Sequence, residues 1–311
     1  MPELPEVETT VRSLNRVVKG LRITDVWSNY NSAFHKGKKN IKDVSYFAFF
    51  KKQIVGKKIL NVERRAKNII INLSGNISVL VHMKMTGHFL FGDYTKKVFK
   101  SGKLKVESWE PKNKTGPLND PMNRFIRMVW TLSNGKHLAF SDLRRFAKIH
   151  LLDAHEKYSD KYIKELGPEP LDKNFTFEQF KKRLTQKPFG RIKNVLIDQT
   201  ILSGIGNIYS DEILWVSWIH PLSSPTRIPS EKLKKVYKEM GRILNKAIKI
   251  GGDSASDFRG IDGRPGGYQN FHQAYRQTGK KCRKRNCAGI ITRLKIGGRS
   301  AHFCPIHQIK Y

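Results

Sequence analysis

The sequence predicts an α+β fold of several domains, with a mostly β N-terminal half, a helical middle and a short cysteine-containing C-terminal segment. Its 311 residues, 39% of them hydrophobic, are enough for more than one core. Strand-like apolar runs dominate up to about residue 153, and apolar residues recur at helical spacing after it. All three cysteines lie after residue 281.

The first expected element is a helix near the N-terminus. Apolar residues recur at helical spacing at Val7, Val11, Leu14 and Val18. Pro5 suits a first helical turn and Gly20 suits a helix stop. Glu6 and Glu8 fall where the helix dipole favours negative charge. This explains the acidic start of a basic protein, although it leaves Pro2 unexplained.

Short strand-like runs follow this helix, at residues 21–27, 69–73, 77–82, 125–132 and 137–141. The pair Asn134-Gly135 between the last two runs predicts a hairpin. The first half is therefore expected to form a sandwich or flattened barrel with one helix. Two lysine-rich stretches, 31–42 and 96–121, are expected to be loops.

Helices are expected at 177–184, 192–198, 207–215 and 230–250. Ser230 suits the N-cap of the last helix, and Gly251-Gly252 suits its end. Residues 251–267 are rich in Gly, Asp and Ser and are expected to form a mobile loop. We expect domains at 1–153, 154–268 and 269–311.

Charge indicates the kind of partner. Lys and Arg total 59 against 26 Asp and Glu, a formal net charge of +33, which favours a polyanionic partner. Nucleic acid is the first candidate; an anionic membrane surface, ribosome association and a merely solubilising charge are the alternatives. No run of about 18 apolar residues and no secretory signal is apparent, so no membrane association is expected.

The C-terminal segment contains a metal-site pattern. Cys282, Cys287, Cys304 and His307 form the spacing Cys-x4-Cys-x16-Cys-x2-His. Two close ligand pairs separated by a hairpin's length are typical of a structural zinc site. Three free thiols are the alternative, and His302 is a competing ligand. The surrounding basic residues suit a hairpin that lies against phosphates.

Three further motifs suggest nucleic-acid contacts. Gly204 and Gly206 flank a turn before a helix that Asn207 can cap, and such a turn can bind an anion. Lys67 precedes an expected strand, where a solvated lysine is the simpler interpretation. Arg144 and Phe146 in the segment "DLRRFAK" can stack in or beside a duplex, or can form an ordinary strand edge.

Pro2 offers a nucleophile if Met1 is removed, because it then carries a free secondary amine. An α-amino group has an unperturbed pKa of about 7.7–8.0, so part of it is neutral near physiological pH. Attack of this amine on a sugar C1′ gives an iminium that makes a C2′ proton acidic and lets a 3′ phosphate leave. Glu3 could act as the acid or base.

These pieces together resemble the formamidopyrimidine-DNA glycosylase/endonuclease VIII family of base-excision repair enzymes. The matching segments include "PELPEVET", "RRAKN", "HMKMTG", "DLRRF", "LGPEPL", "IKNVLIDQTILSGIGNIYSDEILW", "GRPGGYQ" and "GGRSAHFC". The resemblance implies an N-terminal β-sandwich with one N-terminal helix, a helical helix–two-turn–helix domain and a C-terminal β-hairpin zinc finger. It also implies that residues 251–268 cover a flipped base.

Residue roles follow from the same resemblance. Pro2 would be the Schiff-base nucleophile and Glu3 the proton donor. Lys67 would contact phosphates around the lesion. Asn207 and Arg299 would grip the same phosphates, with Arg299 also assisting a second elimination.

The resemblance places further DNA contacts as well. Glu6 would shape the lesion pocket and Lys193 would contact the DNA backbone. Met85, Arg144 and Phe146 would fill the gap that a flipped base leaves in the stack.

The implied function is a bifunctional DNA glycosylase and abasic-site lyase that acts by β,δ-elimination. The segments "PELPEVE" and "DGRPGGYQ" favour oxidised purines, such as 8-oxoguanine and formamidopyrimidines, as its substrates. Its partner would be double-stranded DNA containing oxidised bases or abasic sites, bound by a monomer. The alternatives are an endonuclease VIII-like enzyme for oxidised pyrimidines and a catalytically silent DNA-binding protein. The finger departs from the family's usual four-cysteine pattern, while Leu143 and Ala147 replace the usual Pro and Gly.

Overall fold

The computed structural model describes residues 1–101, 104–153 and 161–311. It divides into two compact units. The first comprises Met1–Pro2, Glu6–Asp160 and Gly251–Gly266, and the second comprises Glu3–Pro5, Lys161–Ile250 and Gly267–Tyr311. The expected boundary at 153–154 borders on residues outside the described ranges, and the division into three domains stays a prediction.

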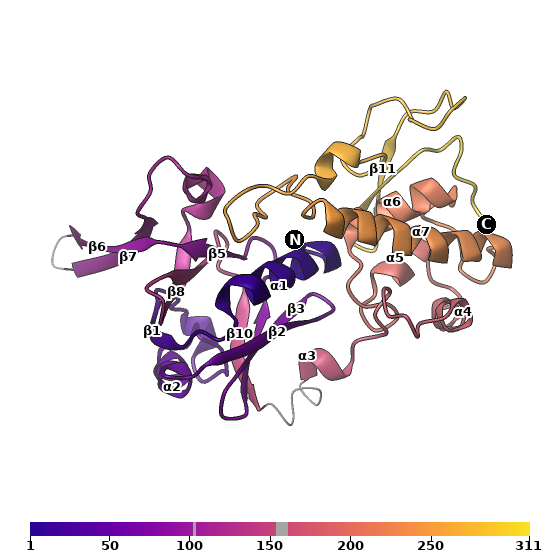
Figure 1. Cartoon of the computed structure of the whole chain (residues 1–311). Coiled ribbons are helices and arrows are strands. Elements are labelled where there is room, and N and C mark those ends of the chain that lie inside the picture. Colours follow the sequence, from indigo (N-terminus) through magenta and orange to yellow (C-terminus); the bar gives the residue numbers. More distant parts are fainter. Residues whose placement is uncertain (102–103, 154–160) are drawn as a thin grey trace. The chain divides into compact units, whose positions relative to one another are not determined.

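The first unit contains two antiparallel four-stranded sheets (Figure 1). One sheet has the order β1 (Ile23–Ser28), β8 (Ile126–Leu132), β9 (His137–Ser141) and β5 (His88–Gly92). The other has the order β10 (Lys148–Asp153), β4 (Ile77–His82), β3 (Asn68–Leu73) and β2 (Ile59–Arg65). One cluster of buried apolar side chains joins both sheets with α1 (Leu4–Val18). The predicted sandwich is confirmed.

A second helix in this unit corrects the expectation of only one. α2 spans Val44–Ile54, and the Asp43 side chain caps it by accepting a hydrogen bond from the backbone N–H of Tyr46 at 2.6 Å. Phe50 and Ile54 are buried in the sandwich core. The prediction was wrong because four aromatic residues crowd the first seven positions of this helix, so no single apolar face stands out in the sequence.

The stretch 96–121 is also not simply a loop. It contains most of the antiparallel pair of β6 (Tyr94–Ser101) and β7 (Leu104–Pro111); residues 102–103, between these strands, lie outside the described ranges. Lys96 pairs with Glu107 at 2.7 Å across the hairpin. Tyr94 and Trp109 pack on a second apolar cluster with residues of β5, β8 and β9. Two of the lysines that suggested a loop, Lys96 and Lys97, therefore pair with glutamates of the opposite strand. Two 3₁₀ turns follow, η2 (Pro117–Asn119) and η3 (Pro121–Asn123).

The second unit is mainly helical. Its helices are α3 (Lys161–Lys164), α4 (Phe177–Thr185), α5 (Ile192–Ile197), α6 (Asn207–Ser217) and α7 (Ser230–Lys249). A 3₁₀ turn, η4 (Tyr268–Phe271), precedes a hairpin of β11 (Thr292–Ile296) and β12 (Arg299–Phe303). The side chains of α4 to α7 share one apolar core.

Three local expectations need correction. Gly206, not Asn207, is the N-cap of α6. The N-cap of α7 is Pro229, and Ser230 is the first residue of that helix. Asn134-Gly135 lies in the hairpin between β8 and β9, but only Gly135 of the pair has positive φ, so the turn is not the tight two-residue type. The stretch 31–42 is irregular except for the 3₁₀ turn η1 (Ala33–His35). Within the described ranges, every helix is too short or too polar to cross a bilayer.

Candidate functional site

The Glu3 side chain lies at the N-terminus of α6. Its carboxylate accepts hydrogen bonds from the backbone N–H groups of Gly206 at 2.8 Å, Ile208 at 2.9 Å and Tyr209 at 3.4 Å. Glu3 is 2% exposed. A helix N-terminus presents free N–H groups and a positive dipole end, so it suits a buried anion. The turn that was expected to bind a phosphate thus holds an internal carboxylate.

Gly206 is required by this arrangement. A Cβ atom at this position would overlap the Glu3 carboxylate. Leu4, the next residue after Glu3, donates its backbone N–H to the Gly204 carbonyl at 3.0 Å. The glycine turn therefore fixes both the direction of the chain start and the orientation of the acid that follows Pro2. Pro2 itself is buried.

Glu6 anchors the start of the 251–268 loop. Its Oε1 accepts a hydrogen bond from the Asp253 backbone N–H at 2.7 Å, and Glu6 is 1% exposed. A Cβ atom on Gly252, which has φ of +81°, would come within 2.9 Å of the same carboxylate. The loop can approach the acid this closely only because residue 252 is glycine.

Lys193, for which the family resemblance implies a contact with the DNA backbone, has partners inside the protein. Its side chain is fully buried and its ammonium lies 2.6 Å from an Asp211 carboxylate oxygen. It also donates to the Asn207 carbonyl at 3.1 Å. Because both bonds are internal, Lys193 supports the first turn of α6 and has no route to a DNA phosphate as placed.

Arg299 remains suited to an anionic ligand, whereas the Asn207 Oδ1 atom is a hydrogen-bond acceptor and cannot donate to a phosphate. Among the described residues, none is a hydrogen-bond partner of the buried Asn207 Oδ1 atom. Arg299 begins β12 and is exposed. The hairpin that carries Arg299 is joined to α6 by His302, whose backbone N–H and Nδ1 lie 3.1 and 2.8 Å from Asp211 Oδ2.

Lys67 lies in the turn between β2 and β3, and it is 6% exposed. Its surroundings are strongly basic. Burial, together with the charges of Lys84, Lys67 and Lys148, lowers the pKa of neighbouring His82 to about 3. His82 is therefore neutral at physiological pH. Its Nδ1 accepts a hydrogen bond from the Lys84 backbone at 3.0 Å. A basic turn of this kind suits an anion such as a phosphate.

The predicted gap-filling residues come from two loops that are tied together. Thr86 donates its hydroxyl to Asp142 at 2.6 Å and accepts the Arg144 backbone N–H at 3.0 Å. Met85 precedes Thr86 and is half-buried, whereas Phe146 is 49% exposed. The Arg144 guanidinium lies over the Phe146 ring at 4.5 Å. An apolar tip with a stacked cation is the form expected of a wedge that enters a duplex.

Sequence reasoning missed the two buried aspartates that organise these segments. Asp142 accepts the Tyr30 hydroxyl at 2.8 Å and the Ala147 backbone N–H at 2.9 Å, in addition to Thr86. Asp211 connects α5, α6 and β12 through Lys193 and His302. Both occur inside quoted motifs, but their partners are distant in sequence, so no spacing rule could identify them.

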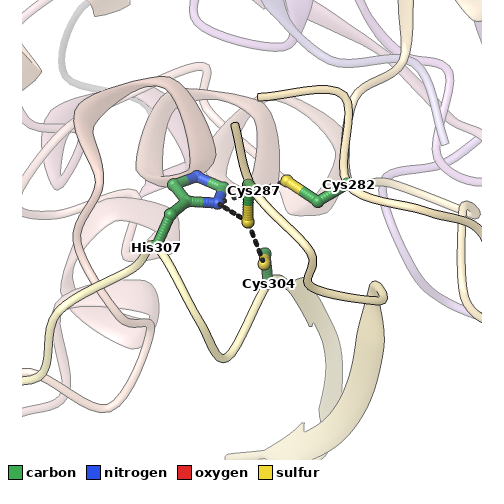
Figure 2. A group of neighbouring side chains, drawn as sticks. All are labelled: Cys282, Cys287, Cys304 and His307. Atoms are coloured by element: carbon green, nitrogen blue, oxygen red, sulfur yellow. Dashed lines mark hydrogen bonds between the residues drawn. The ribbon is translucent and has the colours of Figure 1, made fainter. Parts of the chain in front are cut away.

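The expected metal ligands converge (Figure 2). Ligand atoms of Cys282, Cys287, Cys304 and His307 all lie within 4.8 Å of one another. The Cys287 and Cys304 sulfurs are 3.6 Å apart, and His307 Nδ1 lies 3.2 Å from the Cys282 sulfur. Such separations suit four ligands around one tetrahedral ion. His302 is not part of the group.

The surroundings of the cluster fit a structural zinc ion. His307 Nε2 lies 3.2 Å from the Trp215 carbonyl, which leaves Nδ1 directed toward the sulfurs. A hydrogen bond of this kind commonly orients a metal-binding histidine. The Gly289 backbone N–H lies 3.4 Å from the Cys287 sulfur, and a Cβ at residue 289 would overlap the Cys304 sulfur. A bound ion would cross-link the two ends of the β11–β12 hairpin.

Known proteins are similar in sequence to this chain over almost its whole length. Residues 1–149 match the domain family described as formamidopyrimidine-DNA glycosylase N-terminal domain, and residues 166–259 match the formamidopyrimidine-DNA glycosylase H2TH domain. A formamidopyrimidine-DNA glycosylase of Pelotomaculum thermopropionicum is 36% identical over 99% of each chain. One of Lactobacillus johnsonii is 33% identical over the full length of both.

Solved structures of protein–DNA complexes are also similar to this chain. A complex between the Lactococcus lactis Fpg and DNA containing an abasic site is 28% identical, with a TM-score of 0.80, over 99% of this chain and 100% of that one. A complex of the wild-type Lactococcus lactis protein with DNA containing N7-benzyl-Fapy-dG has the same identity, TM-score and coverage.

Proposed function

This chain belongs to the formamidopyrimidine-DNA glycosylase family of DNA-repair enzymes, and from this we propose that it excises oxidised purines and then cleaves the strand by β,δ-elimination. The substrates proposed are 8-oxoguanine and formamidopyrimidines in double-stranded DNA. The observation that carries the proposal is the chain start, where Pro2 is followed by an acid held by three backbone N–H groups.

Pro2 is the proposed nucleophile once Met1 has been removed. Its secondary amine attacks C1′ of the damaged nucleotide, the glycosidic bond breaks, and the proton that the Pro2 nitrogen loses passes through the Glu3 carboxylate to the departing base. The O4′–C1′ bond then breaks, O4′ takes a proton from water to become a hydroxyl group, and the nitrogen lone pair forms a cationic iminium with C1′. The iminium acidifies C2′–H, so loss of this proton expels the 3′ phosphate. A second elimination expels the 5′ phosphate.

Other residues are proposed to hold the substrate. Lys67, Asn207 and Arg299 contact the phosphates around the lesion, and Arg299 assists the second elimination. Asn207 would donate through its side-chain NH2 group, and Arg299 is exposed at the start of β12. Glu6 shapes the lesion pocket through its bond to the 251–268 loop.

The remaining proposed roles concern the stack and the hairpin. Met85, Arg144 and Phe146 fill the gap left by the flipped base. A single zinc ion held by Cys282, Cys287, Cys304 and His307 fixes the hairpin that presents Arg299. The zinc is structural and takes no part in the reaction. The domain division 1–153, 154–268 and 269–311 is proposed with these roles.

Support for a damaged-DNA substrate comes from the similar solved structures, which are complexes with abasic-site and Fapy-dG analogue DNA. The test is a cleavage assay on duplexes that each contain one lesion: 8-oxoguanine, a formamidopyrimidine, an oxidised pyrimidine or an abasic site. We expect release of the two oxidised purines, and product ends that carry phosphate on both sides of the gap. Preference for the oxidised pyrimidine would assign the chain to endonuclease VIII-like chemistry instead.

A further inference from the structure

The first unit contains a pocket of about 510 Å³ between the stretch 31–42 and the loop that carries Phe146. Four basic side chains line it: His35, Lys42, Lys84 and Arg145. None of the lining residues that the structure describes is Asp or Glu. The aromatic rings of Phe34 and Phe146 complete the wall, and Phe34 is 78% exposed. The pocket is thus positive, with an apolar rim.

Lys42 is the unusual member of this group. It is 4% exposed, although lysine is rarely buried without a counter-ion. Its ammonium forms neither a hydrogen bond nor an ion pair with any residue in the described ranges. It lies over the Tyr30 ring, 5.7 Å from the ring centroid. The side chain therefore lines a pocket without a partner of its own.

Asp142, the neighbouring acid, does not pair with the Lys42 ammonium. The carboxylate of Asp142 already accepts hydrogen bonds from Tyr30, Thr86 and the Ala147 backbone. Burial, with a contribution from nearby Lys148 and Lys84, lowers the pKa of Lys42 to about 8, although Asp142 partly opposes the shift. Holding this cation without an anion costs free energy, which an incoming anion would recover.

We propose that this pocket binds a phosphate group of a nucleotide, with Lys42 as the central cation and Lys84 and Arg145 beside it. Phe34 offers a surface on which a base can stack. The source we assign is the DNA substrate itself, because Phe146 forms one wall of the pocket and is the proposed wedge. This assignment rests on the proposed function. No counterpart of the lysine-rich stretch was apparent in the family resemblance, so the contact extends the footprint on DNA.

The test is the affinity of the full-length protein for an undamaged duplex, measured at several salt concentrations. Each phosphate contact adds about 0.9 to the slope of log K against log salt. Lys42→Met is expected to lower the slope by about one contact and to weaken binding at low salt about tenfold. Lys39→Met is the matched control, since Lys39 is exposed in the same stretch and does not line the pocket. The affinity of Lys39→Met for the duplex should be within about twofold of that of the parent protein.

Two results would overturn the proposal. One is a Lys42→Met protein with the parent affinity and slope. The other is binding of free deoxynucleoside monophosphate that Lys42→Met abolishes while duplex affinity stays unchanged, which would assign the pocket to a free nucleotide. If thermal melting shows that Lys42→Met does not fold, Arg145→Met replaces it, because Arg145 is exposed. This variant should show the same decrease in salt slope and duplex affinity. Because these titrations need no cleavage, they remain informative even if the proposed lyase chemistry fails.

Discussion

At the residue scale, the contact between Glu3 and the start of α6 makes the sharpest prediction. Gly206→Ala should displace the buried carboxylate, because the added Cβ would overlap it. We expect a loss of about 1–3 kcal/mol in the free energy of unfolding and a larger fractional loss of lesion cleavage. Denaturant unfolding and single-turnover assays would measure the two effects.

Gly241→Ala is the control for this substitution. Gly241 lies inside α7, where nothing is within 4 Å of the added Cβ. Alanine there should stabilise the protein by about 0.5–1 kcal/mol, because glycine is a poor helix former. Equal effects of the two substitutions would show that the Gly206 turn does not depend on Glu3.

Glu8 gives a prediction about pH. Its carboxylate bonds Arg64 and Arg12, each at 2.7 Å. Burial alone would raise the pKa of Glu8, but the hydrogen bonds and charges of the two arginines outweigh it and lower the pKa. The folded pKa is thus below the unfolded value of about 4.3, so the stabilisation is present above pH 4.3 and disappears as pH falls through the folded pKa.

Arg64→Met should therefore cost roughly 1–3 kcal/mol of unfolding free energy at pH 7, and much less near pH 3. Arg12→Met should cost less than about 0.5 kcal/mol, because the Arg12 side chain is 58% exposed and that of Arg64 is 12% exposed. Urea unfolding curves at the two pH values provide the comparison. A cost for Arg64→Met that does not change with pH would contradict this role for Glu8.

At the element scale, the β11–β12 hairpin depends on the proposed zinc. His307→Cys should keep one zinc per chain and keep activity, because thiolate is an equally good ligand. His307→Ala should lose both, since the hairpin that presents Arg299 would no longer be cross-linked. Elemental analysis and a lesion-cleavage assay on each variant measure these outcomes.

His302→Ala separates the two histidines. It should keep the zinc, because His302 is bonded to Asp211 and is outside the cluster. Zinc loss in His302→Ala, or full activity of protein that contains no zinc, would overturn the assignment.

The wedge loop is the second element to test. Phe146→Ala removes a stacking surface worth about 1–3 kcal/mol. We expect poor processing of an intact lesion duplex and nearly normal cleavage of a pre-formed abasic site, which has no base to extrude. Cleavage rates on both substrates, measured with one protein preparation, distinguish a role of Phe146 in base extrusion from a role in the fold. Equal losses would show that Phe146 supports the fold instead.

Elements were predictable where the pattern is local. β4 and β9 follow the expected ranges, because their apolar runs are short and bounded by turn residues. The α2 helix was not predicted, since its closely spaced aromatic residues mark no single face and its buried side depends on the sandwich. The β6–β7 hairpin was missed for a similar reason: its lysines pair with glutamates of the opposite strand and its aromatic residues pack on a sheet, neither of which the local pattern shows.

At the scale of the whole molecule, only those parts of the candidate site that depend on short sequence gaps could be predicted. The metal cluster could be predicted because short gaps place its ligand pairs together, whatever the rest of the fold does. The burial of Lys193 could not, since Asp211 becomes its partner only when α5 packs on α6. Family motifs gave the position of Lys193 but not its surroundings. The net charge of +33 predicted a polyanion, and the similar solved structures are complexes with DNA.

The proposed lyase chemistry depends on a covalent iminium between residue 2 and damaged DNA. Borohydride reduction during reaction with an 8-oxoguanine duplex, followed by proteolysis and mass spectrometry of the cross-linked peptide, tests it most directly. We predict a single adduct on the N-terminal amine of Pro2, with none in protein that retains Met1. An adduct on Lys67 or on any other lysine would contradict it.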